Sequence, residues 1–94
     1  MKSKNNQIKY SYNNKIHDCL LVYITSNTIK IRVNQIFIEN DLVGIGLKNN
    51  YEMNNWYWLK CKVVSVENQL VTLMLLKLYD EDDIFIDNYI KSLF

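Results

Sequence analysis

Apolar and polar side chains alternate along most of this 94-residue chain, and that period of two is what most restricts its fold. The clearest case is the segment in which Ile29, Ile31 and Val33 alternate with Lys30 and Arg32. Such alternation is typical of a strand with one face in the core and the other toward solvent. Similar short runs follow one another with brief polar turns between them. We therefore expect five to seven strands in a small barrel or sandwich.

The other strands are expected where apolar and β-branched residues lie between turn-forming residues. These ranges are residues 15–25, 42–47, 56–67 and 70–78. The first of them is almost continuously apolar and therefore predicts a buried strand. Residues 1–14 are polar and rich in Asn, so we interpret them as a loose arm. Alternation of Ile8, Tyr10 and Tyr12 within the arm would allow it to add an edge strand.

The period changes in the last segment. Ile86, Tyr89, Ile90 and Leu93 fall on one face at helical spacing. Residues 80–83 are all acidic, and negative charge is favourable at a helix N-terminus, where Asp80 could act as the cap. We therefore interpret the acidic run as a helix start and predict a helix over residues 81–94, packed on the barrel. The predicted organisation is one domain, residues 15–94, after the 1–14 arm.

The residues that commonly carry catalysis or bind metals are few and scattered. His17 is the only histidine, and no nucleophile stands at a recognised spacing from it. Cys19 and Cys61 match no metal or redox spacing, so we expect two buried, reduced thiols. Gly44 and Gly46 lie in an apolar run with no helix after it, which favours a bulge or a close backbone contact over a phosphate loop. We expect a protein that is not an enzyme and holds no metal or cofactor.

Charge and hydropathy also limit the classes of partner that we expect for this chain. The net charge is +1, which argues against a dominant electrostatic hold on nucleic acid or on an anionic membrane. No apolar run approaches the roughly 20 residues that cross a bilayer, and no apolar stretch follows the first basic residues. We therefore expect a cytoplasmic protein without membrane insertion.

The strand from residue 56 carries the most informative pattern. Side chains alternate across a sheet, so Tyr57, Leu59, Cys61 and Val63 form one set, which has the character of core. The opposite face carries Trp56, Trp58, Lys60 and Lys62. Three interpretations remain open for this face: it is covered by the helix or the arm, it binds a protein through tryptophan anchors, or it stacks single-stranded nucleic acid. Near-zero net charge and a single arginine count against the third.

The order of elements from about Leu20 to Phe94 resembles the PilZ domain, a six-stranded antiparallel barrel with a C-terminal helix that many bacteria use as a cyclic di-GMP receptor. Residues 23–28 fall where that family carries Asp-x-Ser-x-x-Gly, and residues 29–33 resemble the strand after the motif. Residues 38–43 resemble the family's next loop and strand, residues 59–66 its later long strand, and residues 83–94 its closing helix. The resemblance implies a mostly-β, PilZ-like six-stranded barrel with a C-terminal helix.

The family's ligand motifs are altered in this chain. Tyr23 stands in place of Asp, Thr25 replaces Ser, and Thr28 stands in place of Gly. The family's arginine pair in the N-terminal arm has no counterpart, although Lys9 and Lys15 could contribute weakly to a ligand. Lysine cannot replace the planar, bidentate guanidinium that stacks on guanine and pairs with phosphate. The chain thus resembles degenerate PilZ proteins, and we expect cyclic di-GMP binding to be weak or absent.

The leading expectation is a non-catalytic PilZ-like adaptor that acts by protein–protein contact in a bacterial motility, surface-appendage or signalling system. Its partner would be another protein or a second copy of the chain. The first alternative is a weak cyclic dinucleotide sensor that uses Thr25, Lys9 and Lys15. A further alternative is a small single-stranded nucleic-acid-binding barrel that uses Trp56 and Trp58 with the lysines at 60 and 62.

Overall fold

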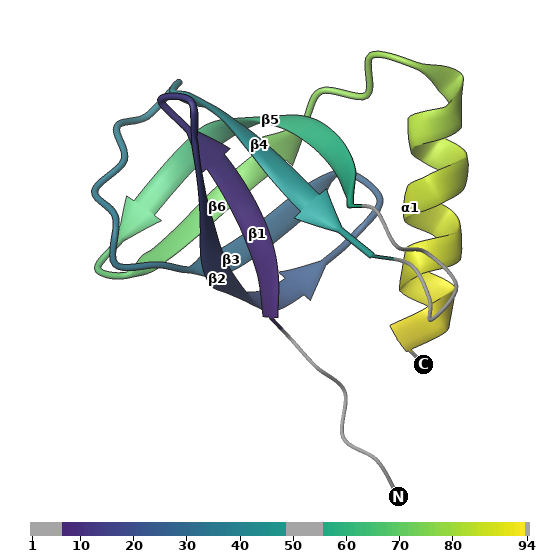
Figure 1. Cartoon of the computed structure of the whole chain (residues 1–94), viewed down its shortest axis with the longest axis horizontal. Coiled ribbons are helices and arrows are strands. Elements are labelled where there is room, and N and C mark those ends of the chain that lie inside the picture. Colours follow the sequence, from purple (N-terminus) through teal and green to yellow (C-terminus); the bar gives the residue numbers. More distant parts are fainter. Residues whose placement is uncertain (1–6, 49–55, 94) are drawn as a thin grey trace, which may run out of the picture.

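The computed structural model describes residues 7–48 and 56–93, and in these ranges the chain forms a closed antiparallel β-barrel followed by one helix (Figure 1). This confirms the predicted fold class. The elements are β1 (Gln7–Tyr12), β2 (Lys15–Ile24), β3 (Thr28–Arg32), β4 (Leu42–Leu47), β5 (Tyr57–Glu67), β6 (Leu70–Leu75) and α1 (Asp80–Leu93). Within the described part of the chain, no helix is long and apolar enough to cross a membrane.

The barrel closes through β1, in the strand order β1-β2-β3-β6-β5-β4. β1 pairs with β2 along its whole length and with β4 from Lys9 to Ser11. Residues 7–12 therefore belong to the barrel wall, and our interpretation of them as a loose arm or an edge strand was wrong. The physical reason is that Ile8 and Tyr10 point inward and are buried with the core. Without β1, the edges of β2 and β4 would be left unpaired.

The core is made by the inward-facing side chains of all six strands. Ile29, Ile31 and Val33 are buried, as their alternation predicted. The prediction that residues 15–25 form a fully buried strand was wrong, since Ile16, Leu20 and Val22 are exposed. A barrel has a single interior, so alternate residues of every strand face outward even where the sequence is apolar.

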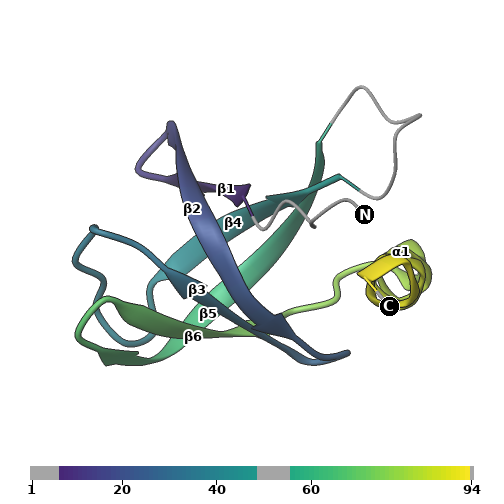
Figure 2. The same cartoon turned by 90° about the horizontal axis from the view of Figure 1, so that it is seen from below.

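The two ends of the barrel are covered by different segments. α1 lies at one end, opposite the loop at residues 33–41 (Figures 1 and 2). Phe85, Ile86 and Tyr89 of α1 are buried in the core cluster, with Ile90 and Leu93 packed against it. At the other end, Phe37 is buried and meets the rings of Tyr10 and Tyr12 edge-on, with ring centroids 5.6 Å and 4.8 Å apart.

The start of α1 is fixed to β5 by a buried carboxylate. Asp82 is only 6% exposed, and its Oδ1 accepts a 2.6 Å hydrogen bond from the Tyr57 hydroxyl. Its other oxygen accepts from the backbone N–H of Tyr79 at 3.4 Å. Asp80, the predicted cap, is instead the first residue of the helix. The side chain that accepts a hydrogen bond from the backbone N–H of the residue before the helix is Asp82, as in a capping box. The rings of Tyr57 and Phe85 stack with centroids 4.1 Å apart, which joins the helix to the barrel.

Candidate functional site

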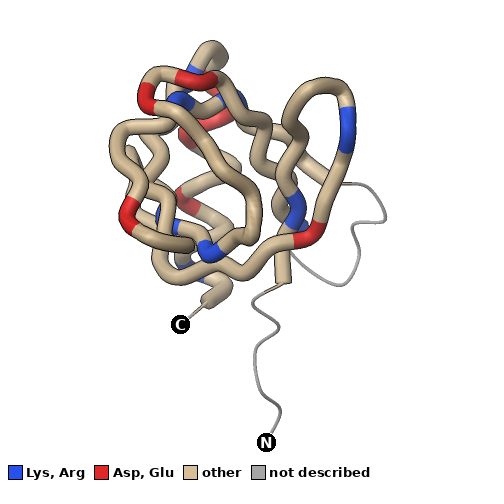
Figure 3. Tube along the Cα trace, turned by 90° about the vertical axis from the view of Figure 1, so that its left-hand side faces the viewer, with Lys and Arg blue, Asp and Glu red and all other residues tan. Residues whose placement is uncertain are grey.

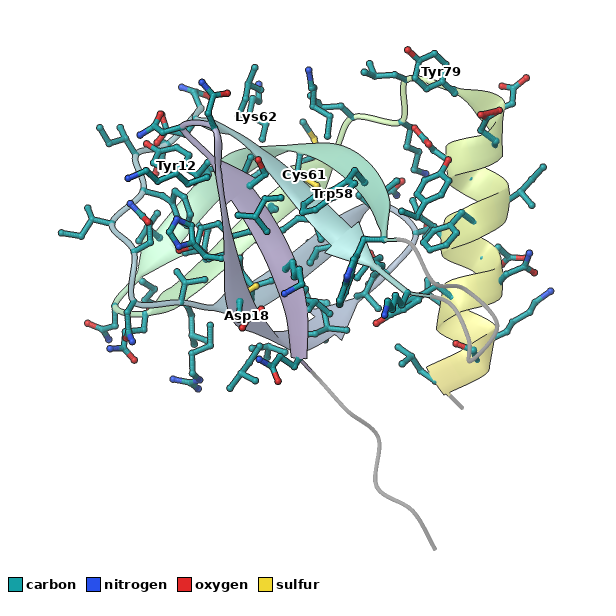
Figure 4. All side chains as sticks on the ribbon, viewed as in Figure 1. Tyr12, Asp18, Trp58, Cys61, Lys62 and Tyr79 are labelled. Carbon is teal, nitrogen blue, oxygen red and sulfur yellow. The ribbon has the colours of Figure 1, made fainter. Side chains whose placement is uncertain are left out.

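Trp58 lies flat across the backbone of β4 on the outer face of the barrel. It pairs in register with Gly46, and a Cβ atom at residue 46 would stand only 3.0 Å from the indole Cη2 and 3.1 Å from Cζ2 and Cζ3. A Cβ at Gly44 would stand 3.6 Å from Cε3 of the same indole, an ordinary contact. The close backbone contact predicted for residues 44–46 is thus present, and its partner is Trp58. The opposite side of the indole faces outward, leaving the residue 39% exposed (Figure 4).

Trp56, immediately before β5, lies between two ammonium groups. Lys9 Nζ is 5.2 Å and Lys48 Nζ is 5.0 Å from the Trp56 ring centroid. Lys9 stands on β1 opposite Gly46, so no side chain intervenes between Lys9 and the tryptophans. Each such cation–π contact contributes about 0.5–1 kcal/mol at an exposed site. We call the surface made by Lys9, Gly46, Lys48, Trp56 and Trp58 the tryptophan face.

An ion pair holds Lys9 in this position. Its Nζ donates to Asp18 Oδ1 on β2 at 2.6 Å. Hydrogen bonding and charge attraction from Lys9 lower the pKa of the Asp18 carboxyl below its usual value. Asp18 therefore stays ionised at neutral pH and fixes the Lys9 ammonium group, which lies 5.2 Å from the Trp56 ring centroid.

The remaining predicted residues of this surface lie further along β5. Lys60 is opposite Gly44 and Lys62 is opposite Leu42, both on the outer face. The inner set Leu59, Cys61 and Val63 is buried, in keeping with the predicted alternation. α1 covers Tyr57 on the inner side and leaves Trp58 exposed, so the helix does not cover the tryptophan face. Residues 1–6 of the predicted arm lie outside the described residues.

The structure does not bring together the three residues proposed for a weakened nucleotide site. Thr25 Oγ1 accepts hydrogen bonds from the backbone N–H groups of Asn27, at 3.2 Å, and Thr28, at 3.0 Å, and so stabilises the β2–β3 turn. Lys15 begins β2 and Thr25 follows its end, about 30 Å away at about 3.3 Å per residue. Lys9 is engaged by Asp18 and Trp56.

Groups with catalytic potential occupy structural positions in the described part of the chain. Cys19 and Cys61 are free and buried, and burial raises the pKa of each thiol to about 12, so neither is a thiolate at neutral pH. The His17 ring stacks on Tyr10 with centroids 5.0 Å apart. Among residues 7–48 and 56–93, no group of three or more potential ligands could hold a metal ion.

Sequence reasoning placed Trp58 on the outer face of its strand, where the structure has it, but missed the neighbours of the two tryptophans. Lys9 had been assigned to a ligand position and Gly46 to a close backbone contact without a named partner, while Lys48 and Asp18 had no assigned role. The available signal was the pair of alternating glycines at 44 and 46, which left one face of β4 without side chains. Which strand would fill that space depends on register, and the alternation pattern does not specify which strands pair.

Comparison with solved structures supports the fold, whereas the comparisons of sequence found no match. No protein-family model matches the sequence, and no curated protein matches it at a significant level. Among solved structures, the chain is similar to the PlzA protein of Borreliella burgdorferi, solved in complex with c-di-GMP, with a TM-score of 0.64 and 13% sequence identity. The match covers 94% of this chain but 34% of the PlzA chain, so the present chain spans about a third of that protein's length. PlzA is a PilZ-domain protein, and the barrel described above is therefore PilZ-like in fold.

Proposed function

We propose that this chain is a non-catalytic, PilZ-like regulatory module that binds a partner protein through the tryptophan face. The observation that carries the proposal is Trp58, whose indole rests on Gly46 on one side and is open to solvent on the other. Tryptophan is among the residues that most often contribute the largest share of binding energy at protein interfaces.

The geometry around the ring favours binding without rearrangement. The backbone of β4 supports the indole from below, so little side-chain entropy remains to be lost when a partner covers it. Lys9 and Lys48 both lie near the Trp56 ring, and Lys48, which takes part in none of the ion pairs of the described residues, leaves a positive charge on this part of the surface because Lys9 is paired with Asp18. A partner with an apolar pocket bordered by carboxylates would match both features. The cellular system proposed for such an adaptor is bacterial motility, a surface appendage or signalling.

The test is capture of the partner by cross-linking in an extract of the source cells, with the captured proteins quantified by mass spectrometry. Trp58→Ala is expected to remove the specific partner, because the anchor is lost. Val64→Ala is the matched control, since Val64 is also exposed on β5 but lies outside the tryptophan face. Undiminished capture by a folded Trp58→Ala variant would show that the partner binds elsewhere.

A cyclic dinucleotide sensor is the second candidate, favoured by the likeness to a protein solved in complex with c-di-GMP. The engagement of Thr25 in its own turn and the distance to Lys15 speak against it. Calorimetric titration with c-di-GMP separates the two functions. The adaptor proposal expects no saturable heat, whereas clear saturation would make the chain a receptor with an unusual pocket.

A further inference from the structure

A second surface runs along one edge of the barrel, from the outer face of β5 to the start of α1. Lys62 stands opposite Met74 of β6, and the backbone N–H of Leu76 donates to the carbonyl of Lys60 at 3.0 Å. The chain then passes through Leu78 and Tyr79 to the acidic first turn of α1. Figure 4 shows Lys62 and Tyr79 at the same upper edge of the molecule.

The two ends of this surface carry opposite charges that the rest of the described chain leaves uncompensated. Lys60 and Lys62 form the basic end, and Asp80 and Glu81 form the acidic end. The ion pairs of the described residues join Lys9 to Asp18, Lys77 to Asp83 and Lys91 to Asp87, and so use none of these four residues. Figure 3 shows both basic and acidic positions at the upper edge of the Cα trace.

Apolar side chains lie between the two charged ends. Met74 is 39% exposed, Leu78 56% and Tyr79 65%. Met74 lies in β6, and Leu78 and Tyr79 lie in the segment that joins β6 to α1, so all three are close to this junction. The surface therefore has a basic end, an apolar centre and an acidic end. We call it the bipolar surface.

We propose that the bipolar surface is the contact of a symmetric dimer, with a second copy of this chain as its occupant. A two-fold axis places the same surface patch on both subunits, so the patch must be complementary to itself. A rotation about the apolar centre brings the lysines of each copy onto the acidic turn of the other and buries Met74, Leu78 and Tyr79 together. Charge complementarity favours a second copy as the occupant, because the basic end and the acidic end that would bind each other are both present on this chain.

The expected dimer is weak and sensitive to salt. Exposed ion pairs add little affinity, so most of the affinity comes from the apolar centre, and the charges mainly set orientation. Raising the salt concentration from about 0.1 M to about 1 M shortens the Debye length from about 10 Å to about 3 Å, which weakens the charged ends. This contact adjoins the tryptophan face at Lys60, which pairs with Gly44 next to the Trp58 ring, but it uses none of the five residues of that face, and neither proposal depends on the other.

Charge reversal with exchange tests the dimer by sedimentation equilibrium of the full chain over a range of concentrations. The variant Lys60→Glu/Lys62→Glu has two acidic ends, and the variant Asp80→Lys/Glu81→Lys has two basic ends. Each alone is expected to dimerise at least about tenfold more weakly than the unmodified chain, since attraction at both ends becomes repulsion. An equimolar mixture of the two variants regains attraction at both ends and is expected to form the heterodimer.

The control separates this contact from a general attraction between oppositely charged molecules. Lys15→Glu/Arg32→Glu makes the same change in net charge at exposed residues outside the bipolar surface. Mixed with the Asp80→Lys/Glu81→Lys variant, it is expected to restore no dimer. A Trp58→Ala variant is expected to dimerise as the unmodified chain does. The proposal is overturned by a monomer at every accessible concentration, by dimers that survive either charge reversal, by equal association in the control mixture, or by loss of the dimer on Trp58→Ala.

Discussion

Replacing Tyr57 by Phe is the sharpest test of how the helix is held on the barrel. The substitution removes one hydroxyl and keeps the ring that stacks on Phe85 at 4.1 Å. Its single polar consequence is the loss of the 2.6 Å hydrogen bond to Asp82 Oδ1. Asp82 is only 6% exposed, so water replaces that donor poorly, and the weaker 3.4 Å bond from the Tyr79 N–H remains on the other oxygen.

The magnitude follows from the charge of the acceptor. A hydrogen bond to a charged group contributes about 1.5–3 kcal/mol to stability, and partial access of water at half-buried Tyr57 favours the lower part of that range. We therefore expect Tyr57→Phe to lower the free energy of unfolding by about 1.5–2 kcal/mol. For a domain of this size, each kcal/mol shifts Tm by about 4–8 °C, which predicts a fall of about 5–15 °C. Urea and thermal unfolding followed by circular dichroism measure both quantities.

A matched control and a double-mutant cycle make the reasoning refutable. Tyr79→Phe removes a hydroxyl from an exposed tyrosine in the same region, and it is expected to change stability by less than about 0.5 kcal/mol. Asp82→Ala alone, and together with Tyr57→Phe, measures the coupling between the two side chains. Stability of Tyr57→Phe equal to that of Tyr79→Phe, or additive effects in the cycle, would show that this hydrogen bond does not hold the helix.

Three further perturbations test other contacts. Gly46→Val places branched carbons beneath the Trp58 indole, where even a Cβ would stand 3.0 Å from the ring, and should move tryptophan emission to longer wavelength, whereas Gly44→Ala should leave it unchanged. Thr25→Val removes the acceptor of two backbone N–H groups and should cost about 1 kcal/mol in urea unfolding, with Thr25→Ser retaining most of it. Burial raises the pKa of Cys19 and Cys61 to about 12 from 9.0, and burial with the Asp82 hydrogen bond raises that of Tyr57 to about 12 from 10.0. These acids hold their protons more tightly in the folded chain, so the urea midpoint should change little between neutral pH and about pH 9 and fall from about pH 9 to 12, less steeply in Cys61→Ala.

The sequence predicted the barrel because local pattern and global fold agree in most strands. Alternation at Ile29, Ile31 and Val33 placed all three in the core, and the switch to helical spacing after residue 80 located the start of α1 to within one residue. The apolar stripe predicted for the helix did not include Phe85, although this residue is buried and stacks on Tyr57. It adjoins Ile86 on the same side of the helix, and an apolar stripe is wider than the narrow set of i, i+3 and i+4 positions.

The first strand and the turn that follows it were harder to predict than the rest of the barrel. Left-handed backbone conformations occur at Asn13, Asn14, Asn40, Asn68 and Lys77, and neither glycine adopts one. Asn tolerates that conformation, and Asn68 lies where a turn was expected between the strands predicted at 56–67 and 70–78, but Asn13 and Asn14 were interpreted as part of the Asn-rich arm. β1 was obscured in the same way, since its Lys- and Asn-rich surroundings resemble an arm, and only pairing with both β2 and β4 makes it a barrel strand.

The β2–β3 turn of this PilZ-like barrel is held closed by hydrogen bonds from within the chain. At the position where the family carries Ser, Thr25 directs its hydroxyl to the N–H groups of Asn27 and Thr28, and its own N–H donates to the Thr28 carbonyl at 2.8 Å. The turn is further held by Lys77, which donates to Asn27 Oδ1 at 2.8 Å and pairs with Asp83 of α1 at 3.0 Å. These contacts close the hairpin and tie it to the helix. The likeness to PlzA at 13% identity supports the barrel fold, and a fold does not by itself fix a ligand, so calorimetric titration with c-di-GMP is the measurement that decides whether this turn contributes to a nucleotide site.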